Sequence, residues 1–181
     1  MLIEHIVDSA KNLLGEDSTL LSQLVAARKR SENWMQIEIY KRLIRNFPKL
    51  QIELERLYPE IRERCDLWCL EADGSESWVE MKVCVTNYAA YYTTHSSPRP
   101  ITNQIADIIR DTQKLKGLPE AFNRHIFLLT YPMIEDHDKH TAWRAHLSSM
   151  EASGVKPEKA LVQAVVRRGK TAFVVGYQIA V

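Results

Sequence analysis

Long hydrophobic runs are absent from the 181-residue chain, and cysteine is scarce. No apolar stretch approaches the roughly 20 residues that a membrane-spanning helix needs, so we expect no association with a membrane. The N-terminal segment carries Glu4, His5 and Asp8, which are not typical of a signal peptide. Three cysteines without an export signal favour reduced, buried thiols over a disulfide framework. These absences predict a cytoplasmic protein.

An excess of charge of one sign is also absent. The chain has 24 Lys and Arg residues against 23 Asp and Glu residues, a formal net charge of +1. Proteins that coat nucleic acid are usually far more basic, because phosphate neutralisation supplies their affinity. Contact with nucleic acid therefore has to come from a local patch. The hydrophobic fraction of 45% is ordinary for a globular chain of one domain.

The spacing of apolar residues predicts helices and strands in a mixed order. Recurrence every three to four residues indicates helices at 2–15, from Asp17 or Ser18 to 30, at 31–47, at 101–117 and from Asp138 onward. Alternation or a continuous apolar run indicates strands at 50–58, 64–70, 77–85, 125–131, 160–166 and 171–181. This order predicts an α/β fold in which helices flank one central mixed sheet. We divide the chain into a helical extension, 1–30, and a main domain, 31–181.

The predicted strand at 77–85 is mostly apolar but contains two charged residues, Glu80 and Lys82. Residues two apart point to the same face of a strand, so Glu80 and Lys82 lie side by side. A three-residue turn at 73–75 would pair Asp66 with Lys82 across the hairpin. Glu80 would then be a diagonal neighbour of Asp66, within reach of a shared ion. The hairpin is therefore predicted to gather two carboxylates and one ammonium group.

Two carboxylates and an ammonium group suit phosphodiester chemistry. Mg²⁺ prefers hard oxygen ligands and is usually held by one or two carboxylates, waters and a substrate phosphate. A bound cation stabilises the attacking and leaving oxygens of an in-line phosphoryl displacement. An adjacent ammonium group neutralises phosphate charge. The trio therefore predicts a Mg²⁺ site, in which Mn²⁺ would be a substitute.

The spacing of this trio resembles a family signature. Asp66, 13 intervening residues and the run EMK at 80–82 look like the motif of the PD-(D/E)XK nucleases, the restriction-endonuclease-like superfamily. Cys65 precedes Asp66 at a position where the motif has Pro. The resemblance implies a core ordered αβββαβ around a four-stranded mixed sheet, and the elements predicted over 33–131 follow that order. The N-terminal helices and the last two strands lie outside it.

The resemblance also implies roles for individual residues. Asp66 and Glu80 would bind the metal, and Lys82 would be the catalytic lysine. Many members add a glutamate from the first core helix, and Glu38 stands where this metal-binding, catalytic residue belongs. Some members place a glutamine early in the helix after the motif strand, and Gln104 is in that position. The implied protein is a Mg²⁺-dependent endonuclease that hydrolyses DNA, and its N-terminal helices would suit a homodimer.

Alternative interpretations stay open for these features. The trio is also compatible with a surface ladder of salt bridges, which contributes little to stability. The fold would also suit a catalytically inactive module that binds nucleic acid or protein. Glu38 and Gln104 are ordinary residues for an exposed helix face and a first helical turn.

Other residues are weaker candidates for ligand contacts. The three cysteines lack the paired spacing of a zinc knuckle, and His137, His140 and His146 lack the helical spacing of a zinc protease. Basic residues at 28–30, 114–116 and 167–168 are candidate phosphate contacts. The Tyr-rich segment at 86–100 is a candidate for stacking on nucleic acid.

Overall fold

The computed structural model describes residues 2–16, 31–86, 101–133, 141–167 and 170–179. Within these ranges it contains helices and strands in the order α1 (Leu2–Glu16), α3 (Ser31–Asn46), β1 (Gln51–Leu57), β2 (Arg64–Leu70), β3 (Glu76–Val85), α4 (Ile101–Lys116), β4 (Asn123–Met133), α5 (Thr141–Ser153), β5 (Val155–Arg167) and β6 (Lys170–Ile179). The predicted helix at 17–30 and the start of the helix at Asp138 lie outside the described residues. The other predicted helices and strands are confirmed, although β5 begins five residues earlier than expected.

A single mixed sheet organises the described part of the chain. Its six strands lie in the order β1-β2-β3-β4-β6-β5. β3 and β4 pair in parallel, and α4 lies between them in the chain, whereas the other neighbours pair antiparallel. Parallel neighbours need such a crossover connection, because a short turn reverses the chain. The predicted mixed α/β architecture is therefore confirmed.

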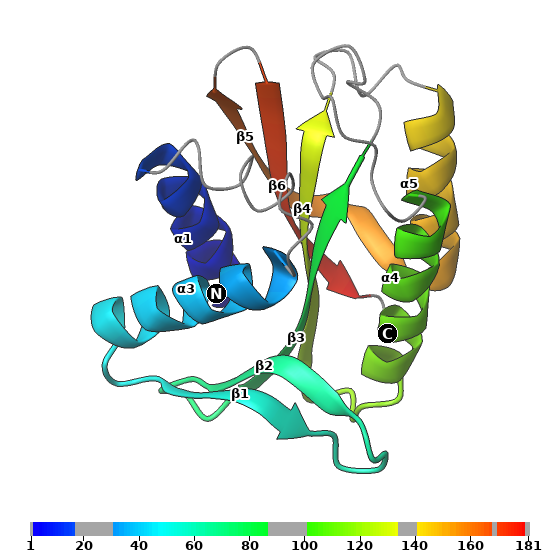
Figure 1. Cartoon of the computed structure of the whole chain (residues 1–181). Helices are drawn as coiled ribbons and strands as arrows, with labels where there is room; N and C mark the ends of the chain where they lie inside the picture. The colour runs from blue at the N-terminus through cyan, green and yellow to red at the C-terminus, as the bar shows by residue number, and fades with distance from the viewer. Residues whose placement is uncertain (1, 17–30, 87–100, 134–140, 168–169, 180–181) are drawn as a thin grey trace.

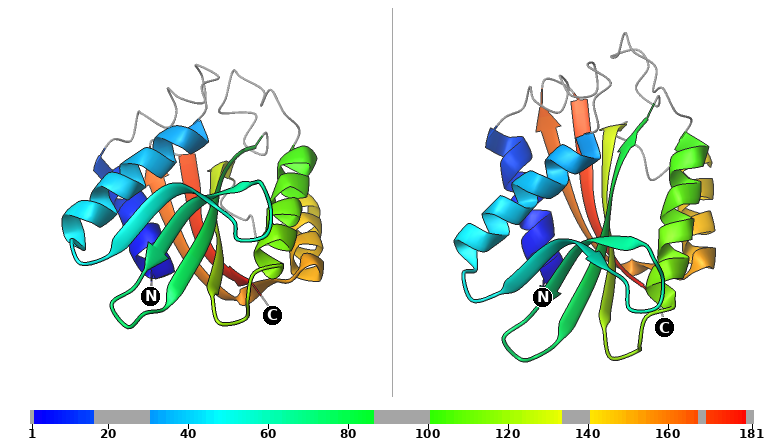
Figure 2. Two further views of the ribbon diagram at one scale, coloured as in Figure 1. Left: turned by 90° about the horizontal axis from the view of Figure 1, so that it is seen from below. Right: turned by 60° about the horizontal axis from the view of Figure 1, so that its bottom comes forward.

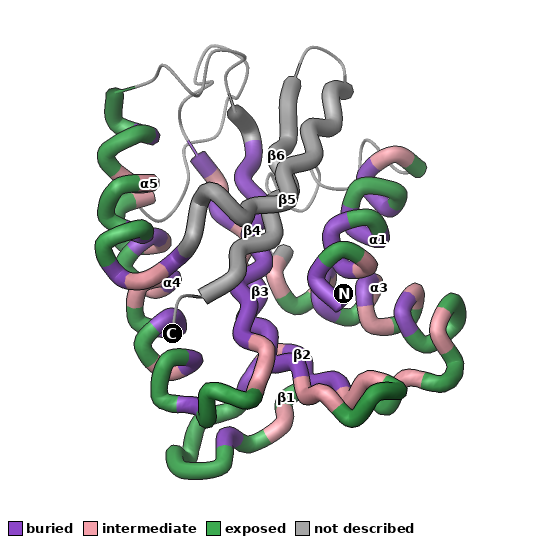
Figure 3. The backbone as a smooth tube through the Cα atoms, turned by 180° about the vertical axis from the view of Figure 1, so that it is seen from behind, coloured by how far each residue is buried: buried purple, intermediate pink, exposed green. Residues whose placement is uncertain are grey.

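Helices cover both faces of the sheet (Figure 1). α1 and α3 lie on one side, and α4 and α5 lie on the other, as the turned views also show (Figure 2). Each side has its own cluster of buried apolar residues. β3 and β4, in the centre, are mostly buried, whereas the outward side of α5 is exposed (Figure 3). β3 therefore contributes side chains to two separate cores.

The first helix packs into the same core as the sheet. Apolar residues of α1 recur at three-to-four spacing from Leu2 to Leu14, and this face is buried against α3 and the sheet. In one cluster they join Met35, Ile39 and Phe127. The division of the chain at residue 30 stays a prediction, but α1 shares its packing with the main domain.

The hairpin between β2 and β3 has a register that differs from the prediction by two residues. Leu67 pairs with Val79, and Glu71 N donates to Ser75 O at 2.9 Å. The turn therefore comprises residues 72–74, with Gly74 at its end at φ +85°, which is the left-handed position that glycine favours in three-residue hairpins. The predicted turn at 73–75 placed this glycine in the middle. The shift of two preserves the alternation of faces, and this register, continued by one residue, would bring Asp66 opposite Glu80 instead of Lys82.

The three cysteines are buried and form no disulfide, as expected. Cys69 lies in the cluster beneath α1 and α3, whereas Cys65 and Cys84 lie in the cluster beneath α4 and α5. Within the described part of the chain, every helix is too short or too polar to cross a bilayer.

Candidate active site around Lys82

Lys82 lies among carboxylates that come from both sides of the sheet. In the described part of the chain, four carboxylate groups approach its Nζ atom within 4.0 Å. The distances are 3.1 Å to Asp111 Oδ2, 3.3 Å to Glu32 Oε1, 3.7 Å to Asp66 Oδ2 and 4.0 Å to Glu80 Oε2. We call these five residues the Lys82 cluster. The predicted trio of Asp66, Glu80 and Lys82 is thus brought together, with two partners that the sequence analysis did not name.

Asp66 is held where β2 separates from β3. The paired register ends at Leu67 and Val79, and beyond it Asp66 Oδ2 accepts a hydrogen bond from Met81 N at 2.7 Å. The carboxylate thus satisfies a backbone donor that the next ladder bond would otherwise take. Gln36 of α3 donates to Asp66 O at 2.7 Å from the other side. Asp66 is therefore fixed by hydrogen bonds at both its side chain and its main chain.

The strand opposite Asp66 has an unusual backbone conformation. Glu55 in β1 has φ +55°, in the left-handed region that side chains other than glycine rarely adopt. Its carbonyl accepts a hydrogen bond from Arg64 Nη1 at 2.6 Å, and its carboxylate accepts one from Gln36 at 3.4 Å. Such strain persists only where surrounding contacts impose it, and it is concentrated at functional sites. The strained residue adjoins the Gln36–Asp66 contact.

Glu80 is a buried carboxylate, with 3% of its surface exposed. Its Oε1 atom accepts a hydrogen bond from Tyr58 Oη at 2.6 Å. Burial, followed by the nearby charges of Asp66 and Asp111, raises the pKa of Glu80 to about 9. The free protein therefore holds Glu80 protonated at neutral pH, and a bound cation would favour its ionised form.

Lys82 remains charged despite its burial. Burial alone would lower its pKa, but the charges of the surrounding carboxylates, Asp66 first among them, outweigh it and raise the pKa. Lys114, paired with Asp111 Oδ1 at 2.8 Å, is the second ammonium group at this place. Four carboxylates thus face two ammonium groups, so the site has an excess of negative charge when all its groups are ionised.

The helix carboxylate in this cluster is Glu32 and not Glu38. Glu38 lies six residues further along α3 and pairs with Lys41 at 2.7 Å on the surface. Glu32, in the first turn, reaches Lys82 and also accepts a hydrogen bond from Val83 N at 3.4 Å. An acidic residue in a first helical turn is favoured by the helix dipole alone, so the sequence holds no signal that singles out Glu32.

Gln104 binds the backbone of the motif strand. Its Nε2 donates to Val85 O at 2.9 Å, and its Oε1 accepts from Val85 N at 3.0 Å. The amide therefore acts like a neighbouring strand at the end of β3, three residues beyond Lys82. Gln104 therefore holds the main chain of β3 next to the cluster.

Asp111 on α4 was missed although the sequence carries a signal for it. The buried face of α4 includes Ile105, Ile108 and Leu115, and Asp111 and Thr112 fall within the same face. A carboxylate in the apolar stripe of an amphipathic helix is rare unless it is paired. A search for charged residues on predicted buried faces would have found Asp111, which has 2% of its surface exposed.

The cluster has the donor chemistry for Mg²⁺, but Lys82 lies at its centre. Carboxylate oxygens are the ligands that Mg²⁺ prefers, and excess negative charge favours a cation. In the described residues, however, no three Asp, Glu, His or Cys side chains converge closely enough to hold a metal ion. The ammonium group of Lys82 contacts the carboxylates instead. The residues therefore fit a metal in kind, and binding would require Lys82 to give up part of its contacts.

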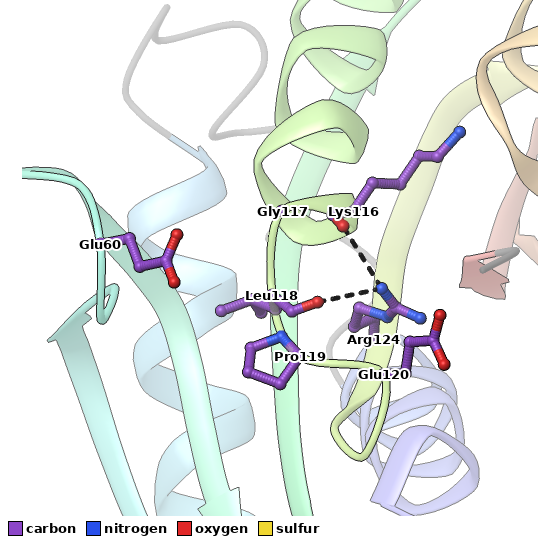
Figure 4. Close-up of a pocket in the computed structure, with 7 residues that line it drawn as sticks. All are labelled: Glu60, Lys116, Gly117, Leu118, Pro119, Glu120 and Arg124. Carbon is purple, nitrogen blue, oxygen red and sulfur yellow. Dashed lines mark hydrogen bonds between the residues drawn. The ribbon is translucent and has the colours of Figure 1, made fainter.

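Two pockets lie at the C-terminal end of α4. The larger, of about 460 Å³, contains no residue of the cluster (Figure 4). There Arg124 Nη1 donates to the carbonyls of Lys116 and Leu118, which suits a cation at a helix C-terminus. The smaller pocket, of about 150 Å³, is lined in part by Tyr58 and Lys114. It therefore adjoins the residues that contact Glu80 and Asp111.

The other residues predicted as ligand contacts lie beside the Lys82 cluster, elsewhere in the fold or outside the described residues. His146 contacts the Trp143 ring, and burial lowers the pKa of this histidine. Lys114 belongs to the ion pairs next to the cluster, and Lys116 donates to Ser153 O at 3.5 Å. The segments 28–30 and 87–100 and the pair His137 and His140 lie outside the described residues.

Comparisons with known proteins do not identify the chain. It matches no family model, no curated protein and no solved structure.

Proposed function

We propose that the protein is a metal-dependent nuclease that hydrolyses phosphodiester bonds of DNA through a PD-(D/E)XK-type site. The observation that carries this proposal is the Lys82 cluster itself. A half-buried lysine on a central strand faces four carboxylates, and one of them, Glu80, has a strongly raised pKa. Shifted ionisable groups gathered at one place are typical of functional sites and costly for a purely structural one.

Each member of the trio has a distinct part in this proposal. Asp66 and Glu80 would hold the cation, which supplies charge neutralisation and activation of water when bound. Lys82 would stay charged, donate hydrogen bonds to the scissile phosphate or the attacking water, and offset developing negative charge. Tyr58 holds Glu80 in place by its hydrogen bond of 2.6 Å.

Two further observations support the proposal. The described elements from α3 to β4 run helix, three strands, helix, strand, which is the order that the family resemblance implies. The three buried thiols form no disulfide, which suits a reducing compartment, and a cytoplasmic location is part of the proposal. A homodimer through the N-terminal helices stays part of the proposal.

A second candidate is a catalytically inactive module of the same architecture that binds nucleic acid or protein. One observation favours it: the Lys82 ammonium group, and not an open position, lies among the carboxylates. In such a module, the ion pairs would hold α3 and α4 against β3 without turnover.

A cleavage assay separates the two candidates. We expect the wild type to cut plasmid, linear or branched DNA with Mg²⁺ or Mn²⁺ and to be inactive with a chelator. Asp66→Asn and Lys82→Met should each lower the rate by about 10²–10³-fold, the usual cost of removing a group that stabilises developing charge. Glu53→Gln is the matched control, because Glu53 is an exposed carboxylate that pairs with Arg56 three residues along the same strand.

The outcomes of this assay are distinct. Cleavage that persists in both Asp66→Asn and Lys82→Met would contradict the assignment of the site. Calorimetric binding of Mn²⁺ to the wild type, without cleavage of any of the three DNA forms, would favour the inactive module.

A further inference from the structure

Asp111 makes the shortest ion pair of the Lys82 ammonium group. The Nζ atom lies 3.1 Å from Asp111 Oδ2, but 3.7 Å from Asp66 and 4.0 Å from Glu80. Asp111 comes from α4, which packs against the sheet from one side, while Glu32 approaches from α3. The lysine is therefore held more closely by a helix than by the two strand carboxylates beside it.

The second oxygen of Asp111 is also engaged. Asp111 Oδ1 lies 2.8 Å from Lys114 Nζ, and Lys114 Nζ lies 2.6 Å from Glu63 Oε2. Glu63 is in the connection between β1 and β2, and 56% of its side chain is exposed. Alternating charges thus lead from the buried Lys82 through Asp111 and Lys114 to the surface. The ammonium group of Lys114 thus lies against the second oxygen of a carboxylate that is itself buried.

The fold itself does not explain a carboxylate at this position. Asp111 lies in the buried, largely apolar stripe of α4, where an apolar residue of similar volume would commonly stabilise a protein as well as a buried ion pair does. Removing Asp111 would also leave no ammonium group without a partner, since Lys82 keeps three carboxylates and Lys114 keeps Glu63.

We propose that Asp111, supported by Lys114, is a positioning residue that holds the Lys82 ammonium group beside Asp66 and Glu80. This inference rests on the proposed nuclease function. Asp111 contacts neither substrate nor metal and acts through Lys82. When a cation binds Asp66 and Glu80, the Asp111 contact retains Lys82 at the site.

The position of Lys82 is measured by pulsed acetylation with acetic anhydride, read by peptide mass spectrometry. In the wild type, the 15% exposure of the Lys82 side chain and its ion pairs should make its labelling slow. We expect Asp111→Asn to raise the labelling rate of Lys82 several-fold, and Lys114→Met to raise it less. Glu63→Gln, at the outer end, should have a small effect. Lys41, with 62% exposure, serves as the internal reference.

The kinetic measurement uses the same variants with DNA and Mg²⁺. Asp111→Asn should lower kcat by about 10–100-fold and leave KM within about threefold, since misplacing a reacting group affects the chemical step more than binding. Asp111→Leu, which suits the apolar stripe, should keep or raise the thermal midpoint while kcat falls. A purely structural ion pair would instead make stability and kcat fall together. Glu53→Gln is again the control.

The outcomes separate this inference from the proposed function. An inactive wild type contradicts the nuclease, but the labelling of Lys82 still tests its positioning. Unchanged Lys82 labelling in both Asp111→Asn and Asp111→Leu overturns the inference, whatever the activity. So does failure of both variants to fold, because the carboxylate would then be required by the fold.

Discussion

The two faces of β3 differ sharply although they alternate along one strand. Val79, Met81 and Val83 point into the apolar cluster beneath α1 and α3. Glu80 and Lys82 point to the other side, between Trp78 and Cys84, which lie in the second cluster. The first face stabilises the fold by excluding water. The second face places ionisable groups in a buried environment, which costs stability, and the proposed function would account for that cost.

The largest expected effect is the loss of folding stability caused by a substitution on the apolar face of β3. Met81→Ala should lower the free energy of unfolding by about 2–5 kcal/mol, because Met81 is 1% exposed and its loss leaves a cavity. Urea denaturation measures this change. Val83→Ala is the control, since Val83 is half-buried on the same face and should cost less. If Met81→Ala unfolded no more easily than Val83→Ala, burial on this face would not be what stabilises the fold.

The stability contributed by the charged face of β3 should depend on pH. The pKa of Glu80 is raised in the folded protein from 4.5 to about 9. As pH rises through this window, the unfolded chain releases the proton while the folded chain keeps it, so stability falls. Glu80→Gln removes this titration and should be more stable than the wild type at pH 8 by more than about 1 kcal/mol.

This difference should disappear at low pH. Below about pH 4, Glu80 is protonated in both states, and the two proteins should unfold alike. Thermal or urea denaturation in the presence of a chelator measures the two profiles, with Glu53→Gln as the control. If the difference in unfolding free energy between Glu80→Gln and the wild type stayed constant from pH 4 to pH 8, the titration of Glu80 would not be its cause.

The smallest effect distinguishes two glutamates of α3. Glu32→Gln should lower the cleavage rate by about three- to fivefold, or about 0.7–1 kcal/mol, because Lys82 keeps three other carboxylates. Glu38→Gln should leave both cleavage and stability nearly unchanged, since its ion pair with Lys41 lies on the surface. Steady-state rates on one DNA substrate measure both. Equal losses of cleavage rate in the two variants would indicate that Glu38 belongs to the site as much as Glu32 does.

The sequence was sufficient to predict much of the architecture. Helix and strand periodicity predicted α1, α3, α4 and the strands around the motif, because the spacing of apolar residues along the chain shows which face of an element is buried. The alternation along β3 placed Glu80 and Lys82 on one face for the same reason. The hairpin register was wrong by two residues, since it depended on which turn position Gly74 takes, and only the last position has a positive φ.

The partners of Lys82 were less accessible from the sequence. Glu32 and Glu38 both lie on an amphipathic helix, and which one reaches Lys82 depends on how α3 crosses the sheet. Asp111 lies 29 residues beyond Lys82 in the chain, and a helix packing against β3 brings the two within 3.1 Å.

The sequence by itself determined which residue types share the face of β3 and that this face carries charge, because strand alternation is a local property of the backbone. The tertiary structure decided that the charged face is enclosed from two sides, with Glu32 from α3 and Asp111 from α4. It also decided the raised pKa of Glu80, because burial and the charges of Asp66 and Asp111 act only once these segments are packed together.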